Sequence, residues 1–408
     1  MLLNCPVRSP HLTAESLGSV RGLSHGSCRT WTRPHSIVID PELPKPTRRF
    51  LTKSREARSR RRRHLRPKLL AVGILVGTHP KFAEHDAGTD HPESAARLDA
   101  VLAGIPESGV ADAVTFFTPE PATMLDLQRV HEPHYIDALR RFCLMGGGQL
   151  DPDTAVSVAS WDAALLAAGS GVDAIRRLRN GEASSAFLAV RPPGHHAVAD
   201  RAMGFCLINN VAVAAASLVN EGERVLIFDF DAHHGNGTQD IFYNNPAVLY
   251  VSVHQYPLYP GTGRADEVGS GEGRGYTVNI PIPAGTTSAT YRSAIDEIIS
   301  PVVESFAPTW VIASAGFDAH RMDPLTELGL SAPDFGEMTA WLFSHVAPGR
   351  RLAFLEGGYD LDALRASTAS TLAGMLGERL VNEEPSRGEA LVPVVRAIRE
   401  ARARSLEL

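Results

Sequence analysis

The 408-residue sequence has few cysteines, and their spacing excludes two classes of site. The four cysteines are scattered and form no Cys-x-x-Cys pair, so the sequence indicates neither a disulfide framework nor a thiolate zinc site. A reducing compartment fits this usage, and we expect a cytoplasmic protein. Long apolar runs are also lacking. The longest lie around Val72–Val76 and Val211–Val219, far below the roughly 18 residues that span a bilayer, so we expect no membrane partner.

The composition lacks the marks of a low-complexity or repetitive chain. Glycine and proline number 35 and 28, well short of the share typical of low-complexity proteins, and no internal repeat is visible. Hydrophobic residues make up 44% and charged residues 21%, as in a globular, soluble protein. The length excludes a miniature scaffold and is compatible with two to three domains.

Charge is divided unevenly along the chain. Residues 1–68 hold 16 basic and 4 acidic residues, whereas the remaining 340 hold 24 basic and 42 acidic residues. The first segment lacks apolar periodicity and is predicted to be a disordered, Arg-rich extension. Three interpretations stay open: an organelle-targeting segment, a tail that binds nucleic acid or other anions, or sequence upstream of the natural product. A secretory signal is not expected, because no apolar h-region follows a basic start.

Residues 69–380 are predicted to form one α/β domain, followed by a helical segment over residues 381–408. Short apolar runs rich in β-branched residues alternate with helix-period stretches, and this order is typical of a parallel sheet covered on both faces. The expected strands are Ala71–Val76, Ala186–Val190, Arg224–Phe230, Ala247–Val253, Tyr276–Ile280, Trp310–Ser314 and Arg351–Leu355. The expected helices are Leu125–Leu144, Trp161–Leu178, Leu207–Val219, Ala289–Phe306, Asp334–His345 and Leu361–Leu376.

Polar clusters follow four of these strands. In an open parallel sheet, ligands bind outside the carboxyl ends of the strands, so such clusters are candidates for one shared site. They are Arg191-Pro-Pro-Gly-His195-His196, Asp229-Phe-Asp231-Ala-His233-His234-Gly-Asn236-Gly, Ala315-Gly-Phe-Asp318-Ala-His320 and Glu356-Gly-Gly-Tyr359.

Three of these side chains are candidate metal ligands. Asp231 and His233 alternate along an extended segment and therefore point to one side, where they can share a cation. Asp318, at the end of another strand, is the natural third donor. Two carboxylates and one imidazole without thiolate suit a catalytic zinc with an open position. The competing interpretation is that Asp231 and His233 only cap the helix near Thr238.

The adjacent pair His195 and His196 follows a rigid Pro-Pro-Gly turn. If a different acceptor orients each ring, the two pKa values separate and the pair can supply both a base and an acid at neutral pH. Asp229 and Asn236 are the available partners, because a carboxylate favours a cationic ring and an amide orients a ring without charging it. The alternative is a pair of surface or metal-binding histidines.

Together with Tyr359, whose hydroxyl can stabilise an oxyanion, these residues predict a metal-dependent amide hydrolase. Tyr359 follows two glycines that permit a sharp turn, although most tyrosines in a sequence are packing residues. A serine or cysteine nucleophile is not indicated, because the sequence has no Gly-x-Ser-x-Gly elbow and no cysteine adjoins the clusters.

The ordered set of motifs resembles the histone deacetylase superfamily, in particular the class II-like branch with bacterial acetyl-lysine and acetylpolyamine amidohydrolases. The resemblance extends from about Gly73 to Leu376. It implies an arginase/deacetylase-like α/β fold with a central, mostly parallel sheet of about eight strands. The motifs are His91-Pro-Glu, Arg191-Pro-Pro-Gly-His-His, Gly204-Phe-Cys, Asp229-Phe-Asp-Ala-His-His-Gly-Asn-Gly-Thr, Tyr259-Pro-Gly-Thr-Gly, Ser314-Ala-Gly-Phe-Asp and Glu356-Gly-Gly-Tyr.

The resemblance implies a role for each matching position. The zinc ligands would be Asp231, His233 and Asp318, with one Zn²⁺ per chain. His196 would be the principal general base and acid, His195 would act mainly electrostatically, and Tyr359 would stabilise the transition state. Asp229 would orient His195, and Asn236 would orient His196. Arg97 would lie near an internal acetate pocket, and Phe205 and Tyr259 would form the walls of the substrate channel. A structural K⁺ or Na⁺ would be bound by Asp229, Ser252 and the backbones of Asp231 and His233.

The substrate is expected to be an acetylated lysine in a protein or peptide, or an acetylated polyamine. At the channel rim, Leu325 follows Asp323-Pro324 where polyamine-preferring relatives can carry an acidic residue, and this favours acyl-lysine. The alternatives are an acetylpolyamine amidohydrolase, an inactive acyl-lysine-binding scaffold and a two-metal, arginase-like ureohydrolase. Iron or cobalt could replace zinc, and the chain could form a homo-oligomer. Nucleic acid would bind only through the Arg-rich extension.

Overall fold

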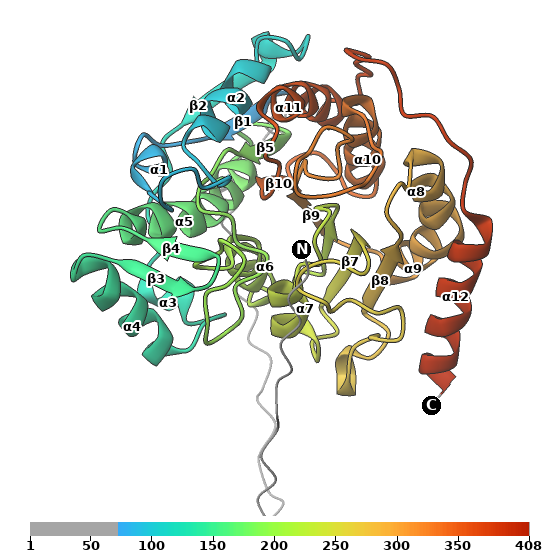
Figure 1. The fold of residues 1–408 in the computed structure, drawn as a ribbon, viewed down its shortest axis with the longest axis horizontal. Coiled ribbons are helices and arrows are strands. Elements are labelled where there is room, and N and C mark those ends of the chain that lie inside the picture. The colour runs from blue at the N-terminus through green and yellow to red at the C-terminus, as the bar shows by residue number, and fades with distance from the viewer. Residues whose placement is uncertain (1–71, 408) are drawn as a thin grey trace, which may run out of the picture. The chain divides into compact units, whose positions relative to one another are not determined.

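The computed structural model describes residues 72–407, and the predictions for residues 1–68 lie outside that range. Within it, eight strands form one sheet, and each pair of neighbouring strands is parallel (Figure 1). The expected parallel sheet of about eight strands is therefore confirmed. In spatial order the strands are β2 (Val114–Phe117), β1 (Ile74–Gly77), β5 (Ser185–Leu188), β10 (Arg351–Leu355), β9 (Trp310–Ala315), β6 (Val225–Asp229), β7 (Val248–Gln255) and β8 (Thr277–Ile282).

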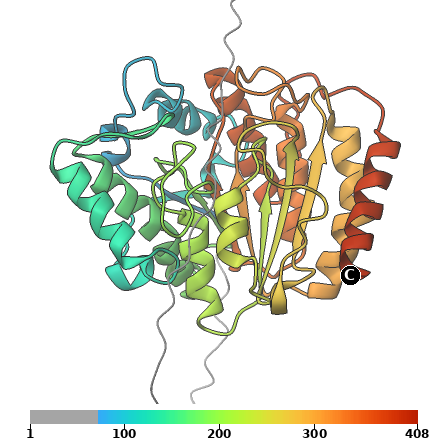
Figure 2. The same cartoon turned by 60° about the horizontal axis from the view of Figure 1, so that its bottom comes forward.

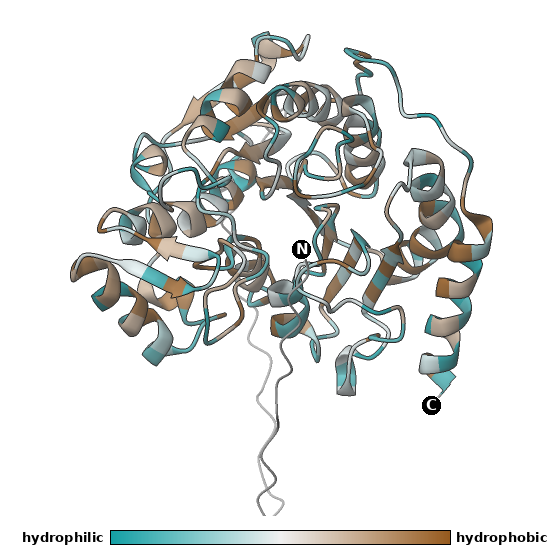
Figure 3. Ribbon diagram, in the orientation of Figure 1, coloured by the Kyte–Doolittle hydropathy of each residue, from teal (hydrophilic) through white to brown (hydrophobic). Residues whose placement is uncertain are grey.

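The central strands are buried on both faces. Every residue of β5, β6, β7 and β9 is buried, so that consecutive side chains, which point to opposite faces, are both removed from water. Figure 3 shows these strands as hydrophobic segments in the interior. This burial explains their continuous apolar sequence, and it leaves the strand ends as the places where polar side chains can emerge.

Helices cover the sheet. The long helix α5 packs on α6 and contacts β1 and β5, whereas α10 packs on α11 and contacts β9 (Figures 1 and 2). The helices are α1 (Lys81–Glu84), α2 (Ala96–Gly104), α3 (Met124–Leu127), α4 (Pro133–Leu144), α5 (Ser160–Arg179), α6 (Asn210–Val219), α7 (Asn236–Phe242), α8 (Ser288–Ala294), α9 (Ser300–Phe306), α10 (Ala332–Ser344), α11 (Leu361–Met375) and α12 (Val392–Glu407). Short 3₁₀ turns lie at η1 (Ala111–Ala113) and η2 (Gly271–Gly273), and a π turn, η3, lies at Ile295–Ile299.

Two expected helices are interrupted, and in each case a proline lies in the first turn of the last part. The helix predicted over Leu125–Leu144 is wrong as one element, because α3 ends at Leu127 and α4 begins at Pro133. Proline lacks the N–H that a continuing helix needs. The helix predicted over Ala289–Phe306 divides into α8, the π turn η3 and α9, and Pro301 lies in the first turn of α9.

The sequence analysis missed strand β2 and the two-stranded hairpin of β3 (Gly148–Asp151) and β4 (Thr154–Val156). β2 is a four-residue edge strand that is apolar in sequence but has only one buried residue, and β3 has no buried residue.

Helix α12, within the segment 381–408, packs against α8 and β8. Val395 and Ile398 are buried, and the Arg402 guanidinium donates to the carbonyls of Gly275 and Thr277. Among the described helices, none is long and apolar enough to cross a membrane.

Candidate active site

The four polar clusters converge at one edge of the sheet. They follow β5, β10, β9 and β6, which are consecutive neighbours in the sheet and all run in the same direction. Their carboxyl ends therefore open on the same edge, where loops from distant parts of the sequence meet.

Asp231, His233 and Asp318 come together as a group of candidate metal ligands. Nδ1 of His233 lies 2.9 Å from Oδ2 of Asp318 and 3.3 Å from Oδ1 of Asp231, and one ligand atom from each residue lies within 4.8 Å of the others. Gly316 and Gly357 permit this approach, because a Cβ at either position would collide with an aspartate oxygen. The N–H of Gly357 also donates to Oδ2 of Asp231 at 2.8 Å.

The charges of this group suit a cation. Burial alone would lower the pKa of His233, but its hydrogen bonds to Asp231 and Asp318 and the charges of both raise the pKa to about 10. Burial and the charge of Asp231 raise the pKa of Asp318 to about 7, against the opposing effect of His233. Two buried carboxylates in contact thus require a positive charge between them, and a divalent ion bound to Oδ, Oδ and Nδ1 atoms would supply it.

The adjacent histidines have different acceptors. Nδ1 of His195 lies 3.1 Å from Oδ2 of Asp229, and Nδ1 of His196 lies 2.8 Å from Oδ1 of Asn236. Burial would lower the pKa of His195, but Asp231 and Asp229 raise it well above its ordinary value. Burial and the neighbouring rings of His195 and His233 lower the pKa of His196 well below its ordinary value.

Tyr359 lies in a turn that Arg97 holds. Nε of Arg97 donates to the carbonyl of Gly358 at 2.7 Å, a second guanidinium nitrogen donates to the carbonyl of Glu356, and the guanidinium lies 5.0 Å from the centroid of the Tyr359 ring. Arg97 is fully buried and is paired with Glu93 at 3.0 Å. The position of the phenol therefore depends on a buried ion pair from α2 and the loop before it.

A cavity of about 240 Å³ leads to these residues. The ring of Phe205 packs edge-on against Tyr359 at 5.9 Å, and the ring of Tyr259 packs edge-on against His196 at 5.1 Å. Tyr259 and Leu325 are each 37% exposed, at the outer end. The predicted channel residues thus line one space together with His196 and His233. The lining comprises Asp153, His196, Gly204, Phe205, His233, Leu258, Tyr259, Leu325 and Tyr359.

Comparison with known proteins agrees with this geometry. The Histone deacetylase domain model matches residues 91–375. A probable deacetylase of Archaeoglobus fulgidus is 43% identical over 319 residues, which cover 76% of this chain and 87% of that protein. This chain belongs to the histone deacetylase family.

Other proteins similar to this chain are also named as histone deacetylases or amidohydrolases. The histone deacetylase-like amidohydrolase of Pseudomonas aeruginosa is 36% identical over 327 residues, 79% of this chain and 85% of that protein. The crystal structure of the HDA15 HD domain matches with a TM-score of 0.75 at 37% identity and covers 83% of this chain and 95% of that chain. The fold is therefore of the arginase/deacetylase-like α/β type, and the class of activity is that of deacetylases and amidohydrolases.

Two residues of the deacetylase site were not assigned from the sequence. The hydroxyl of Tyr250 donates to Oδ2 of Asp229 at 3.1 Å, so the carboxylate that faces His195 is fixed from a second side. Tyr250 lies on β7, and its sequence gives no signal apart from that of a buried strand residue. Only the pairing of β6 with β7 brings it to Asp229.

Glu356 is the second such residue. Its Oε2 accepts the N–H groups of Gly194 at 2.7 Å and His195 at 3.2 Å, whereas Oε1 is buried without a hydrogen-bond partner. Burial raises the pKa of Glu356 to about 7. Cys206, His195 and Glu356 also bring ligand atoms within 4.8 Å, but burial raises the pKa of the Cys206 thiol, which disfavours the thiolate that a metal requires.

Ser252 lies opposite Asp229 in the register of β6 and β7. Its hydroxyl lies 2.9 Å from Nδ1 of His254. The N–H of Asp231 donates to Oδ1 of Asp229 at 3.3 Å. The expected monovalent-cation site at Asp229, Ser252 and the backbones of Asp231 and His233 stays a prediction.

Proposed function

We propose that this chain is a zinc-dependent deacetylase that hydrolyses N-acetylated lysine side chains or related acylated primary amines. The observation that carries the proposal is the pair of adjacent histidines with opposed pKa shifts, beside three candidate metal ligands, with His196 in the lining of a cavity of about 240 Å³. A structural or scaffolding role would require neither the separated pKa values nor the open approach.

Asp231, His233 and Asp318 would hold the zinc ion. The donor set fits, because two carboxylates and a neutral imidazole leave a coordination position free. When bound, zinc supplies Lewis acidity that activates a water molecule and polarises the amide carbonyl. Iron and cobalt accept the same donors, so the metal in the cell has to be determined by analysis of the purified protein.

His196 would be the principal proton carrier. Its pKa lies below the ordinary value, so its ring is neutral near pH 7 and its Nε2 can accept a proton from the attacking water. The contact of Nδ1 with Asn236 fixes the ring. The same Nε2 would then return the proton to the leaving amine, and the products are acetate and a free amine. His195, held by Asp229, would remain cationic and stabilise the negative charge that develops.

Tyr359 would donate its hydroxyl to the carbonyl oxygen as that oxygen becomes negative. Burial raises the pKa of Tyr359 well above its ordinary value, so the hydroxyl keeps its proton. Phe205 and Tyr259 would enclose the alkyl stem of the substrate, since their rings border the cavity.

Acetylpolyamine hydrolysis is the second candidate. Leu325 offers no charge to a polyamine, which favours acyl-lysine, but the carboxyl group of Asp153 also borders the cavity. Burial and Asp151 raise the pKa of Asp153, and a cationic substrate would favour its ionised form. An assay of an acetyl-lysine peptide and acetylspermidine at equal concentration, on metal-analysed protein, tests the proposal. Faster turnover of the peptide supports it, and turnover of acetylspermidine alone would favour the polyamine function.

A structural K⁺ or Na⁺ would bind at Asp229, Ser252 and the backbones of Asp231 and His233. Removal of both ions by dialysis into a tetramethylammonium buffer should lower the melting temperature, and K⁺ or Na⁺ should restore it. An unchanged melting temperature would contradict this site.

Residues 1–68 would be dispensable for catalysis. Their charge suits either targeting or weak binding to nucleic acid, and for the rest of the chain we propose a cytoplasmic location. Comparison of the full chain with one that starts near Val72 should give equal turnover, and a DNA-binding titration of both would assign any affinity to the extension.

A further inference from the structure

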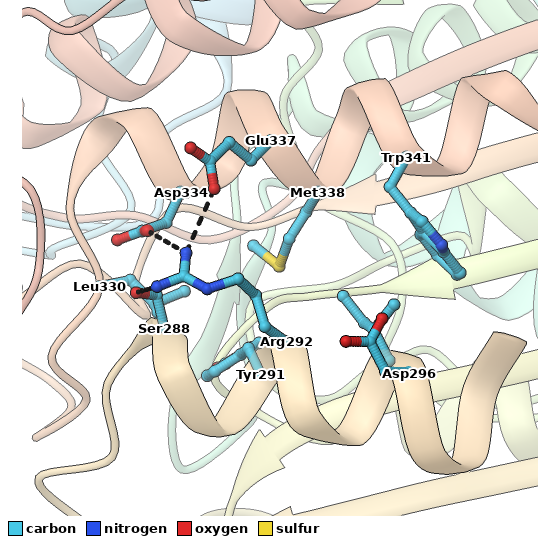
Figure 4. A pocket seen from close by; sticks show the side chains of 10 residues that line it. Ser288, Tyr291, Arg292, Asp296, Leu330, Asp334, Glu337, Met338 and Trp341 are labelled. Carbon is cyan, nitrogen blue, oxygen red and sulfur yellow. Dashed lines mark hydrogen bonds and ion pairs between the residues drawn. The ribbon is translucent and has the colours of Figure 1, made fainter. Parts of the chain in front are cut away.

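A second cavity, of about 220 Å³, lies between α8 and α10 (Figure 4). Its walls are mainly apolar, with Tyr291 and Ile295 on one side and Leu330, Met338 and Trp341 on the other. None of the proposed metal ligands or catalytic residues borders it. What binds here would therefore be independent of the deacetylase site.

At one end of this cavity the charged side chains are paired with one another. Nη1 of Arg292 lies 3.2 Å from Glu337 and 3.6 Å from Asp334, and Nη2 donates to the hydroxyl of Ser288 at 2.9 Å. Figure 4 shows the guanidinium reaching from α8 across to α10. An anionic ligand would have to displace these contacts, so this end does not favour one.

The other end presents a carboxylate without a partner. Asp296 borders the cavity, is exposed, and forms no ion pair among residues 72–407. Figure 4 shows Met338 and Trp341 pointing from α10 towards the helix that carries Asp296. The Trp341 ring is fixed by edge-on contacts with Phe228 at 5.3 Å and His345 at 4.8 Å. A carboxylate beside an indole and a thioether is an arrangement that attracts organic cations.

The backbone at this end is also unusual. Ile295 and Asp296 are the first two residues of the π turn η3. Such turns are rare and are frequently found at functional sites. Here Ile295, which is buried, and Asp296, which is exposed, both border the cavity.

The geometry points to a binding site for a small organic ammonium ion with an apolar body. The ammonium group would pair with Asp296, and the apolar body would lie against Met338 and Trp341. The volume accommodates a ligand of about ten non-hydrogen atoms, since a cavity of ~150 Å³ is enough for benzene. Phenethylammonium has this size and charge distribution and serves as the probe.

The test is calorimetric titration of the metal-loaded full chain with phenethylammonium, 2-phenylethanol and phenylacetate, which share one ring and differ in charge. We expect a Kd of about 1 mM for the ammonium ion, which is the order reached by ligands of this size. The neutral alcohol should bind about threefold more weakly, because an exposed charge pair contributes modestly, and the anion more weakly still. Equal affinity for all three would overturn the proposal.

Two variants test whether the probe binds in this cavity. Asp296→Asn should reduce the affinity for the ammonium ion to that of the alcohol and leave the alcohol unaffected, while the control Asp112→Asn, also an exposed carboxylate, should change neither. Ile295→Phe should fill the cavity and abolish binding of both. The melting temperature of each variant shows whether the fold is retained, and Trp341→Phe, which keeps an aromatic wall, provides a second test if Ile295→Phe is unstable. Undiminished binding of the ammonium ion to Asp296→Asn would refute the assignment.

Discussion

The side-chain oxygen of Asn236 lies 2.8 Å from Nδ1 of His196. The corresponding atom of His195, one residue earlier, faces the carboxylate of Asp229 instead. An amide fixes the orientation of a ring without adding charge, whereas a carboxylate stabilises the protonated ring. The difference between these two partners, together with the surrounding charges, gives two adjacent histidines opposite pKa shifts.

Replacing the amide by a carboxylate should therefore move the acid limb of the pH–rate profile. The proposed mechanism requires a neutral His196, so we expect activity to fall as the pH drops through the pKa of that residue. In Asn236→Asp the new charge raises this pKa, and the limb should shift upward by about 1 pH unit, the lower end of the range for a carboxylate in contact. Profiles of kcat/KM between pH 5 and 9 measure the shift. The exposed control Asn220→Asp should leave the profile unchanged, and a profile of Asn236→Asp that matches the parent would contradict the role of His196.

The clusters that meet at the site were recognisable because each follows a buried strand. Asp231, His233 and Asp318 stand at strand ends, and polar residues there have few reasons to be present apart from a ligand. Tyr250 and Glu356 could not be assigned in this way. Tyr250 acts across two neighbouring strands, and the order of strands in a sheet is not encoded locally. Glu356 belongs to one of the motifs, but its contacts with Gly194 and His195 depend on β5 and β10 being adjacent.

The missed strands β2 and β3 are weakly buried, and β4 is only three residues long. The hairpin of β3 and β4 carries Asp153, which borders the active-site cavity, yet its polar sequence gives no apolar alternation. Pro133 itself is a local signal for the interruption, because the residue before a proline is biased away from helix. Local periodicity thus located the core, whereas the substrate-facing loops required the three-dimensional arrangement.

Removal of the Tyr359 hydroxyl should reduce turnover without loss of metal. Tyr359→Phe keeps the ring that packs against Phe205 and Arg97, so the site should stay folded. We expect kcat to fall by about 10²- to 10³-fold, the usual effect of losing one oxyanion donor. Turnover and metal content are measured on the same sample, with the partly buried Tyr243→Phe as control. Turnover close to that of the parent would show that the phenol takes no part in the reaction.

Loss of the Glu356 carboxylate should destabilise the histidine turn. Glu356→Leu leaves the N–H groups of Gly194 and His195 without an acceptor in a buried place, which should lower the free energy of unfolding by about 3 kcal/mol. Glu356→Gln keeps one acceptor oxygen and should lose much less. Urea denaturation of both variants, with the exposed Glu378→Leu as control, measures the difference. Equal stability of the Leu and Gln variants would mean that these two hydrogen bonds contribute little.

His131 should make the fold sensitive to acid. Its Nδ1 lies 3.0 Å from the carbonyl of Val198, and its Nε2 accepts the N–H of Asn209 at 2.9 Å, so both contacts are made by the neutral ring. Burial lowers its pKa from 6.5 to about 4. Because the unfolded chain binds the proton more tightly, this contribution is complete above about pH 6.5 and is lost as the pH falls towards 4, by about 3 kcal/mol in total.

The corresponding measurement is the free energy of unfolding between pH 4 and 7. In His131→Gln the slope of the free energy of unfolding against pH should correspond to the uptake of about one proton fewer on unfolding. The exposed control His134→Gln should keep the slope of the parent. If His131→Gln has the same slope as the parent, other groups cause the acid sensitivity.

Removal of the metal should destabilise the fold as well as stop catalysis. Without a divalent ion, Asp231 and Asp318 depend on a protonated His233 to offset their charges, as the raised pKa of that imidazole indicates. A ligand present at ~1,000 times its Kd stabilises the state that binds it by about 4 kcal/mol, so chelation should lower the melting temperature and zinc should restore it. Calorimetry of the parent and of Asp318→Asn, each with and without chelator, measures the effect. Asp318→Asn should respond weakly because it lacks one of the three proposed ligands, and an equal response in both proteins would place the stabilising ion elsewhere.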